Sequence, residues 1–105
     1  MDKLAALNQI LAANPNDTFA RYGLAMELAS QHKIEQALAA FDQCIASDPD
    51  YVPAYQMSAQ TLAANGNPEL AIARLHHGIA AANRTGNQHA LAEMEALRDE
   101  LTHRS

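Results

Sequence analysis

Hydrophobic and polar positions along this chain alternate with the period of an α-helix. Large apolar residues and alanines recur three and four residues apart in separate stretches, the spacing that places them on one face of a helix. Short polar segments containing proline, glycine or asparagine separate these stretches. The pattern predicts six helices, the first ending near residue 13 and the others over about 18–31, 34–47, 51–64, 68–82 and 88–103. Because the connections are short, we expect neighbouring helices to be antiparallel.

The residues at the predicted helix ends support these boundaries. Asp17 is suited to cap the second helix, and the segment 48–50 repeats the same stop-and-cap chemistry before the fourth helix. Gly66 suits the left-handed conformation that often ends a helix. Asn67 is a candidate cap for the fifth helix, with proline at the first helical position. We expect residues 83–87 to form the turn before the last helix.

The apolar pattern also repeats along the chain with a period of 34 residues. Shifting the sequence by one period keeps large residues on large ones and small residues on small ones in both types of helix. The matching sets are Leu4, Leu38 and Ile72; Leu7, Phe41 and Leu75; Leu11, Ile45 and Ile79; Ala12, Ala46 and Ala80; Ala20 and Ala54; Ala25 and Ala59; Leu28 and Leu62; Pro15 and Pro49. A fixed period of this length is typical of stacked helix-pair repeats.

Composition agrees with an all-α fold. Alanine, the best helix former, accounts for 23 of the 105 residues, whereas Trp is absent and Phe and Tyr together number five. A chain of this length fits one domain over residues 1–105 and buries about two-thirds of the surface that its unfolded form exposes.

The repeated positions resemble those of the tetratricopeptide repeat family. The first helix of that motif requires a large residue, a small one and a large one, and here they are Leu24, Ala25 and Leu28, then Ala59 and Leu62. The second helix of the motif is matched by Ala37, Phe41, Cys44 and Pro49, then by Ala71, Leu75 and Gly78. The departures are Ser58 at an apolar position, Arg21 and Tyr55 in place of the early Trp, and Asn83 in place of the second proline.

The resemblance implies a short right-handed α-solenoid of antiparallel helix hairpins. Two full repeats would span 18–51 and 52–85, preceded by a half-repeat helix within 1–17 and followed by a capping helix within 86–105. In that last helix the apolar residues do not keep the strict family register, so its packing is left open. These residues are Leu91, Met94, Leu97 and Leu101.

Charge and targeting features exclude several classes of function. The net charge is −5, and the seven Lys and Arg residues are scattered, so the basic stripe of a nucleic-acid-binding protein is not expected. The sequence contains neither a stretch of about 20 apolar residues nor a secretory signal pattern, which predicts a cytoplasmic protein without a membrane partner. Cys44 is the only cysteine, so neither an internal disulfide nor a thiolate zinc site is expected.

The residues that could carry chemistry are few. His76 and His77 are adjacent and would point about 100° apart on a helix, and the pairs His89–Glu93 and Asp99–His103 supply too few ligands for a metal. Cys44 lies among core positions without a basic neighbour at helical spacing. We therefore expect no catalytic residue, metal or cofactor, and the chain is predicted not to be an enzyme.

The best candidate for a functional surface is a second apolar stripe on the helix over 18–31. In the family, the remaining face of the first helix of each repeat lines a concave groove. Carried over by position, the partner-binding residues would be Phe19, Tyr22, Met26, Ser30, Gln56, Gln60 and Ala63. These positions lack the cations with which some family members hold a terminal carboxylate, so a neutral peptide or helical segment suits them better. Alternatively, the stripe is covered by the first helix of the chain.

Two functions follow from this surface. The first is a protein-interaction module, an adaptor or scaffold, that binds a peptide or helical segment of another protein. The second is a structural subunit that self-associates, for example as a homodimer, because stacked repeats leave an uncovered end face.

Overall fold

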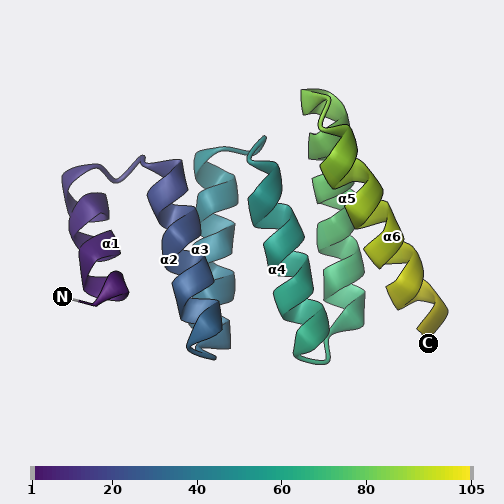
Figure 1. Ribbon diagram of the computed structural model, residues 1–105, viewed down its shortest axis with the longest axis horizontal. Helices are drawn as coiled ribbons and strands as arrows, with labels where there is room; N and C mark the ends of the chain where they lie inside the picture. Colours follow the sequence, from purple (N-terminus) through teal and green to yellow (C-terminus); the bar gives the residue numbers. More distant parts are fainter. Residues whose placement is uncertain (1, 105) are drawn as a thin grey trace. The chain divides into compact units, whose positions relative to one another are not determined.

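The computed structural model describes residues 2–104, which contain six α-helices and no strand (Figure 1). The helices are α1 (Lys3–Ala13), α2 (Thr18–Ser30), α3 (Ile34–Ser47), α4 (Val52–Ala64), α5 (Pro68–Thr85) and α6 (Gln88–Arg104). The all-α prediction is confirmed, and five of the six predicted helices end within about one residue of their observed ends. The chain divides into two compact units, Met1–Pro49 and Asp50–Ser105, and each is described by itself.

In the first unit, α2 packs against both α1 and α3 (Figure 1). Small residues lie at the interface of α2 and α3, where Ala25 and Ala37 are both fully buried. Phe41 is also fully buried, and the centroid of its ring lies 6.4 Å from the ring centroid of Tyr22, with the two rings tilted relative to each other. Alanines at these positions let the two helix backbones approach, and the aromatic pair fills the remaining space.

In the second unit, α4, α5 and α6 all pack against one another. Gly78 on α5 is at the centre of this packing, because a Cβ atom there would lie only 2.7 Å from both Met94 Sδ and Tyr55 Cβ. The missing side chain thus allows α4 and α6 to meet over α5. Leu75 and Met94 are fully buried around it.

Several helix ends follow the sequence predictions. The carboxylate of Asp17 accepts a hydrogen bond of 2.9 Å from the backbone N–H of Ala20, which confirms the predicted cap of α2. Asp2 caps α1 in the same way, at 2.7 Å from the N–H of Ala5. Gly66 has φ of +78°, the left-handed conformation expected for it.

Two helix ends differ from the sequence predictions, and a third agrees with them. The residue at the N-cap of α4 is Tyr51 rather than Asp50, whose carboxylate accepts a hydrogen bond of 2.9 Å from Arg84 Nε. Asn67 is the N-cap of α5 with proline in the first turn, as predicted, and its side chain makes no capping bond with the described residues. Finally, α5 continues to Thr85, because the first residue with a left-handed backbone is Gly86 (φ +72°).

One buried polar group has no counterpart in the first repeat. Ser58 on α4 is fully buried, and its hydroxyl finds no hydrogen-bond partner in the part of the chain that the structure describes. The 34-residue alignment places it on Leu24 of α2. A hydroxyl thus replaces an apolar side chain in the core.

Candidate functional site

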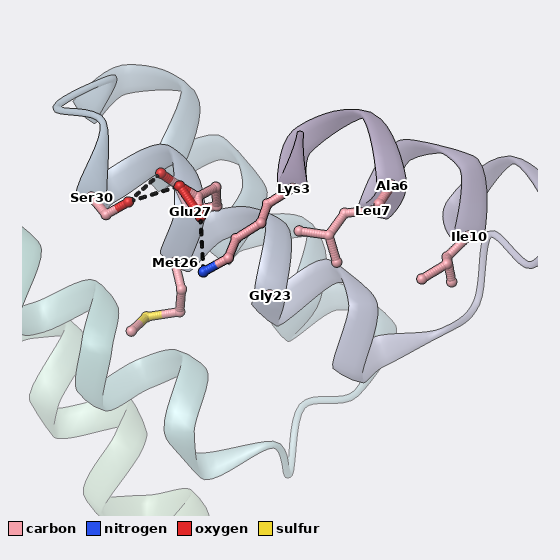
Figure 2. Close-up of a pocket in the computed structure, with 8 residues that line it drawn as sticks. All are labelled: Lys3, Ala6, Leu7, Ile10, Gly23, Met26, Glu27 and Ser30. Carbon is pink, nitrogen blue, oxygen red and sulfur yellow. Dashed lines mark hydrogen bonds and ion pairs between the residues drawn. The ribbon is translucent and has the colours of Figure 1, made fainter. Parts of the chain in front are cut away.

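An open groove lies between α1 and α2 in the first unit (Figure 2). It has a volume of about 480 Å³, within the range of roughly 300–1,000 Å³ that is usual for ligand pockets. Four residues of α1 line one wall: Lys3, Ala6, Leu7 and Ile10. Four residues of α2 line the other wall: Gly23, Met26, Glu27 and Ser30.

Most of this groove is apolar because α1 is covered on one side only. None of the residues of α1, from Lys3 to Ala13, is buried. Leu7 packs toward Gly23, where a Cβ atom would lie 3.2 Å from Leu7 Cδ2, while Ile10 remains 46% exposed. The side chains of Leu7, Ile10 and Met26 therefore offer apolar surface to a ligand in the groove.

The groove has one polar end, organised around Glu27 (Figure 2). Lys3 Nζ lies 3.8 Å from Glu27 Oε1, and Ser30 Oγ donates a hydrogen bond of 3.0 Å to Glu27 Oε2. Gln31 Nε2 donates a further bond of 3.3 Å to the same carboxylate oxygen. Because the charges of Lys3 and Glu27 offset each other, this end of the groove is polar without a net charge.

The structure separates the predicted binding residues of the first unit. Met26 and Ser30 line the groove. Phe19, at the start of α2, is 74% exposed and does not line it. Tyr22 is half-buried against Phe41, and burial is the main cause that raises the pKa of its hydroxyl. Tyr22 thus contributes to packing within the helix pair as well as to its surface.

The predicted binding residues of the second unit lie on α4. Gln56 and Gln60 line a second groove of about 370 Å³, together with Glu93 and Glu100 of α6. Gln56 Nε2 donates a hydrogen bond of 3.1 Å to Glu93 Oε1. Ala63 is half-buried and does not line this groove.

Sequence reasoning missed the α1 wall of the first groove. Leu7 and Ile10 align with the buried Phe41 and Cys44, so their pattern alone is that of core residues. The signal that could have revealed them is the repeat register, because α1 aligns with the second helices α3 and α5 and residues 2–104 contain no first helix that pairs with it.

The other candidate chemistry is placed as follows. Cys44 is fully buried, with Sγ 3.6 Å from the carbonyl oxygen of Thr18, and burial, aided by the charge of Asp48, raises its pKa to about 11. This thiol is neutral at physiological pH and belongs to the core. His76 and His77 are exposed on α5.

Residues 2–104 lack two features that would point to other functions. These residues hold no group of three or more side chains that could bind a metal ion. None of the helices there is both long and apolar enough to span a membrane.

Comparisons with known proteins agree with the repeat pattern. The family model for the tetratricopeptide repeat matches residues 28–94. A tetratricopeptide repeat domain protein from Salinibacter ruber is 31% identical, with a TM-score of 0.78 over 84% of this chain and 89% of that one. No curated protein matches the sequence.

Two further solved structures are similar in fold at lower identity. One is the TPR2B-domain:pHsp70 complex of yeast Sti1, at 20% identity and a TM-score of 0.88, covering 97% of this chain and 82% of that one. The other is a protein from Bordetella parapertussis, at 23% identity and a TM-score of 0.84, covering 99% and 90%. Together with the repeated helix pairs and the matching family model, these findings lead to one conclusion: the chain belongs to the tetratricopeptide repeat family.

Proposed function

We propose that this chain is a non-enzymatic protein-interaction module that binds a peptide or helical segment of another protein. Repeats of this family provide extended binding surfaces, and similar folds include a domain whose complex with pHsp70 has been solved. The observation that carries the proposal is the open groove between α1 and α2, where Leu7, Ile10 and Met26 offer apolar surface to solvent.

The chemistry of this groove favours a neutral, partly apolar segment. Apolar side chains of the partner would be removed from water against Leu7, Ile10 and Met26, which contributes about 25 cal/mol for each Å² buried. Met26 is flexible enough to adapt to different side chains. At the polar end, Lys3 is already paired with Glu27, so a terminal carboxylate would have to compete with Glu27 for the one cationic side chain among the described residues that line the groove.

The surface inferred from the sequence belongs to this proposal. In the first unit, Met26 and Ser30 would contact the partner inside the groove, with the exposed ring of Phe19 and the face of Tyr22 as further contacts. In the second unit, we assign the partner-binding role to three residues of α4. These are Gln56, Gln60 and Ala63, and the side-chain amides of the two glutamines would pair with the backbone of a bound segment. A cytoplasmic location stays a prediction from the sequence.

Peptides selected from a random library on the immobilised chain provide the test. Ile10→Asp places a charge in the apolar groove, so we expect it to lower the affinity for the selected peptides at least tenfold. Because Ile10 is 46% exposed, the substitution should not unfold the chain. The matched control is Leu70→Asp, at an apolar residue of α5 that is 55% exposed and outside the groove. Equal affinities of the two variants, measured by calorimetry, would refute the assignment of the site.

The second candidate function is self-association through the uncovered side of α1. It is favoured by one observation: α1 has no buried residue, and Ile10 leaves apolar surface exposed at this edge of the first unit. Light scattering over a hundredfold dilution separates the two proposals. A mass of two chains that persists on dilution supports the homodimer, whereas a constant mass of one chain eliminates it.

A further inference from the structure

The repeat pattern identifies what the groove between α1 and α2 lacks. Shifted by two repeat lengths, the pair α1–α2 corresponds to the pair α5–α6 of the second unit. The groove residues then align as Lys3 with Ala71, Leu7 with Leu75, Ile10 with Gly78 and Met26 with Met94. The second unit therefore contains an internal copy of the same groove walls.

In that copy the walls are completely covered. Ala71, Leu75 and Met94 have 0% of their surface exposed, and Gly78 is buried. The helix that covers them is α4, which packs on both α5 and α6. Tyr55 of α4 lies directly against Gly78, because a Cβ atom on that glycine would be only 2.7 Å from Tyr55 Cβ.

In the first unit the helix that corresponds to α4 is absent from residues 2–104. Ile10 is consequently 46% exposed where Gly78 is buried, and Met26 and Leu7 are only half-buried where Met94 and Leu75 are inaccessible. The same apolar face thus exists twice, once beneath a helix and once open to solvent.

We propose that the groove is a socket for an amphipathic α-helix of another protein, which takes the place that α4 holds in the second unit. This inference rests on the proposed function and specifies the kind of segment that is bound. The apolar face of α4 has Tyr55, Ala59 and Leu62 buried at spacings of four and three residues. We infer that the partner helix presents the same order: an aromatic residue, a small residue one turn later, and a leucine three residues beyond it.

The charges of α6 favour a different protein over a second copy of this chain. In a head-to-tail pair, α6 of one copy would supply the missing helix to α1 of the next. Asp99 and Glu100 of α6 are exposed and already form ion pairs with Arg98 and Arg104. Placed against Leu7 and Ile10, these ion pairs would lose their water without gaining a polar partner, because Lys3 is already paired with Glu27.

The test uses the full chain and two synthetic peptides. The first peptide has the sequence of residues 51–64, which contains α4, and the second carries Ala59→Pro, which breaks the helix but keeps the other side chains. We expect the first peptide to shift the methyl resonances of Met26 and Ile10 and to gain helical circular dichroism on binding. The proline peptide should bind at least tenfold more weakly than the first peptide. In the chain, Ile10→Asp should lower the affinity for the first peptide at least tenfold, whereas Leu70→Asp should leave that affinity unchanged.

The other outcomes distinguish the inference from the proposed function. If both peptides bind equally, the groove accepts extended segments, and the helix socket is refuted while the interaction module stands. If the helical peptide does not bind but library peptides do, the socket is again refuted. If the Met26 and Ile10 resonances shift with protein concentration alone, the occupant is a second copy of the chain and the inference fails.

Discussion

Replacing Ser58 with alanine should stabilise the protein. The Ser58 hydroxyl is fully buried in α4 and makes no hydrogen bond with any described residue. In the unfolded chain the same hydroxyl is bonded to water, so folding loses that bond without replacing it. The substitution Ser58→Ala removes the hydroxyl and changes the packing volume by one oxygen atom.

Two effects set the size of the gain. Leaving a buried polar group unsatisfied costs about 1–3 kcal/mol, and alanine is favoured over serine inside a helix by up to about 0.5 kcal/mol. Small losses of dispersion contacts around the removed oxygen oppose these effects. We therefore expect the free energy of unfolding to rise by about 1–2 kcal/mol. For a chain of this size each 1 kcal/mol raises Tm by about 4–8 °C.

Thermal and urea unfolding, followed by circular dichroism, measure the gain. Gln60→Ala is the matched control, because Gln60 lies on the same helix but is exposed, so only helix propensity changes there. We expect that control to alter the free energy of unfolding by less than about 0.5 kcal/mol. A Ser58→Ala chain that is no more stable than the wild type would show that the hydroxyl is satisfied in solution, which would refute the reasoning.

Three further predictions concern the core, a helix cap and the buried thiol. Gly78→Ala should destabilise by about 1–3 kcal/mol in urea unfolding, because its Cβ meets two neighbours at 2.7 Å, whereas Gly23→Ala, with the flexible end of a leucine 3.2 Å away, should cost clearly less. Asp17→Ala should cost about 1 kcal/mol through loss of the α2 cap, and Asp50→Ala, at an exposed ion pair, should cost less; equal effects in thermal unfolding would contradict the capping argument. Because burial raises the pKa of Cys44 from 9.0 to about 11, the unfolded chain loses its thiol proton first, and stability should fall as the pH rises from about 9 to 11. A Cys44→Ala chain should lack this part of the pH dependence, and an identical fall in both chains would contradict it.

The sequence predicted the helices well because their signals are local. The cap at Asp17 and the glycine at Gly66 act within a few residues of the helix ends that they define. The failures at Asp50 and Thr85 have a different origin. Asp50 interacts with Arg84, 34 residues away, and α5 continues because nothing before Gly86 forces the backbone out of the helix. Neither fact could be read from the flanking residues.

The candidate site was predictable only in part, for a physical reason. Met26 and Ser30 could be named because they lie on the open face of a repeat helix. Leu7 and Ile10 have the same apolar pattern as residues that are buried elsewhere in the repeat. Periodicity shows which face of a helix is apolar, but whether another helix covers that face depends on packing between distant segments.

The central claim is that the groove between α1 and α2 binds a segment of another protein. Its most direct test is a methyl spectrum of the full chain, labelled at Met, Ile and Leu, titrated with a peptide selected from a random library. We predict that the largest shifts fall on Leu7, Ile10 and Met26, while Leu70 stays unchanged. Shifts that centre on Leu70, or that spare all three groove residues, would contradict the claim.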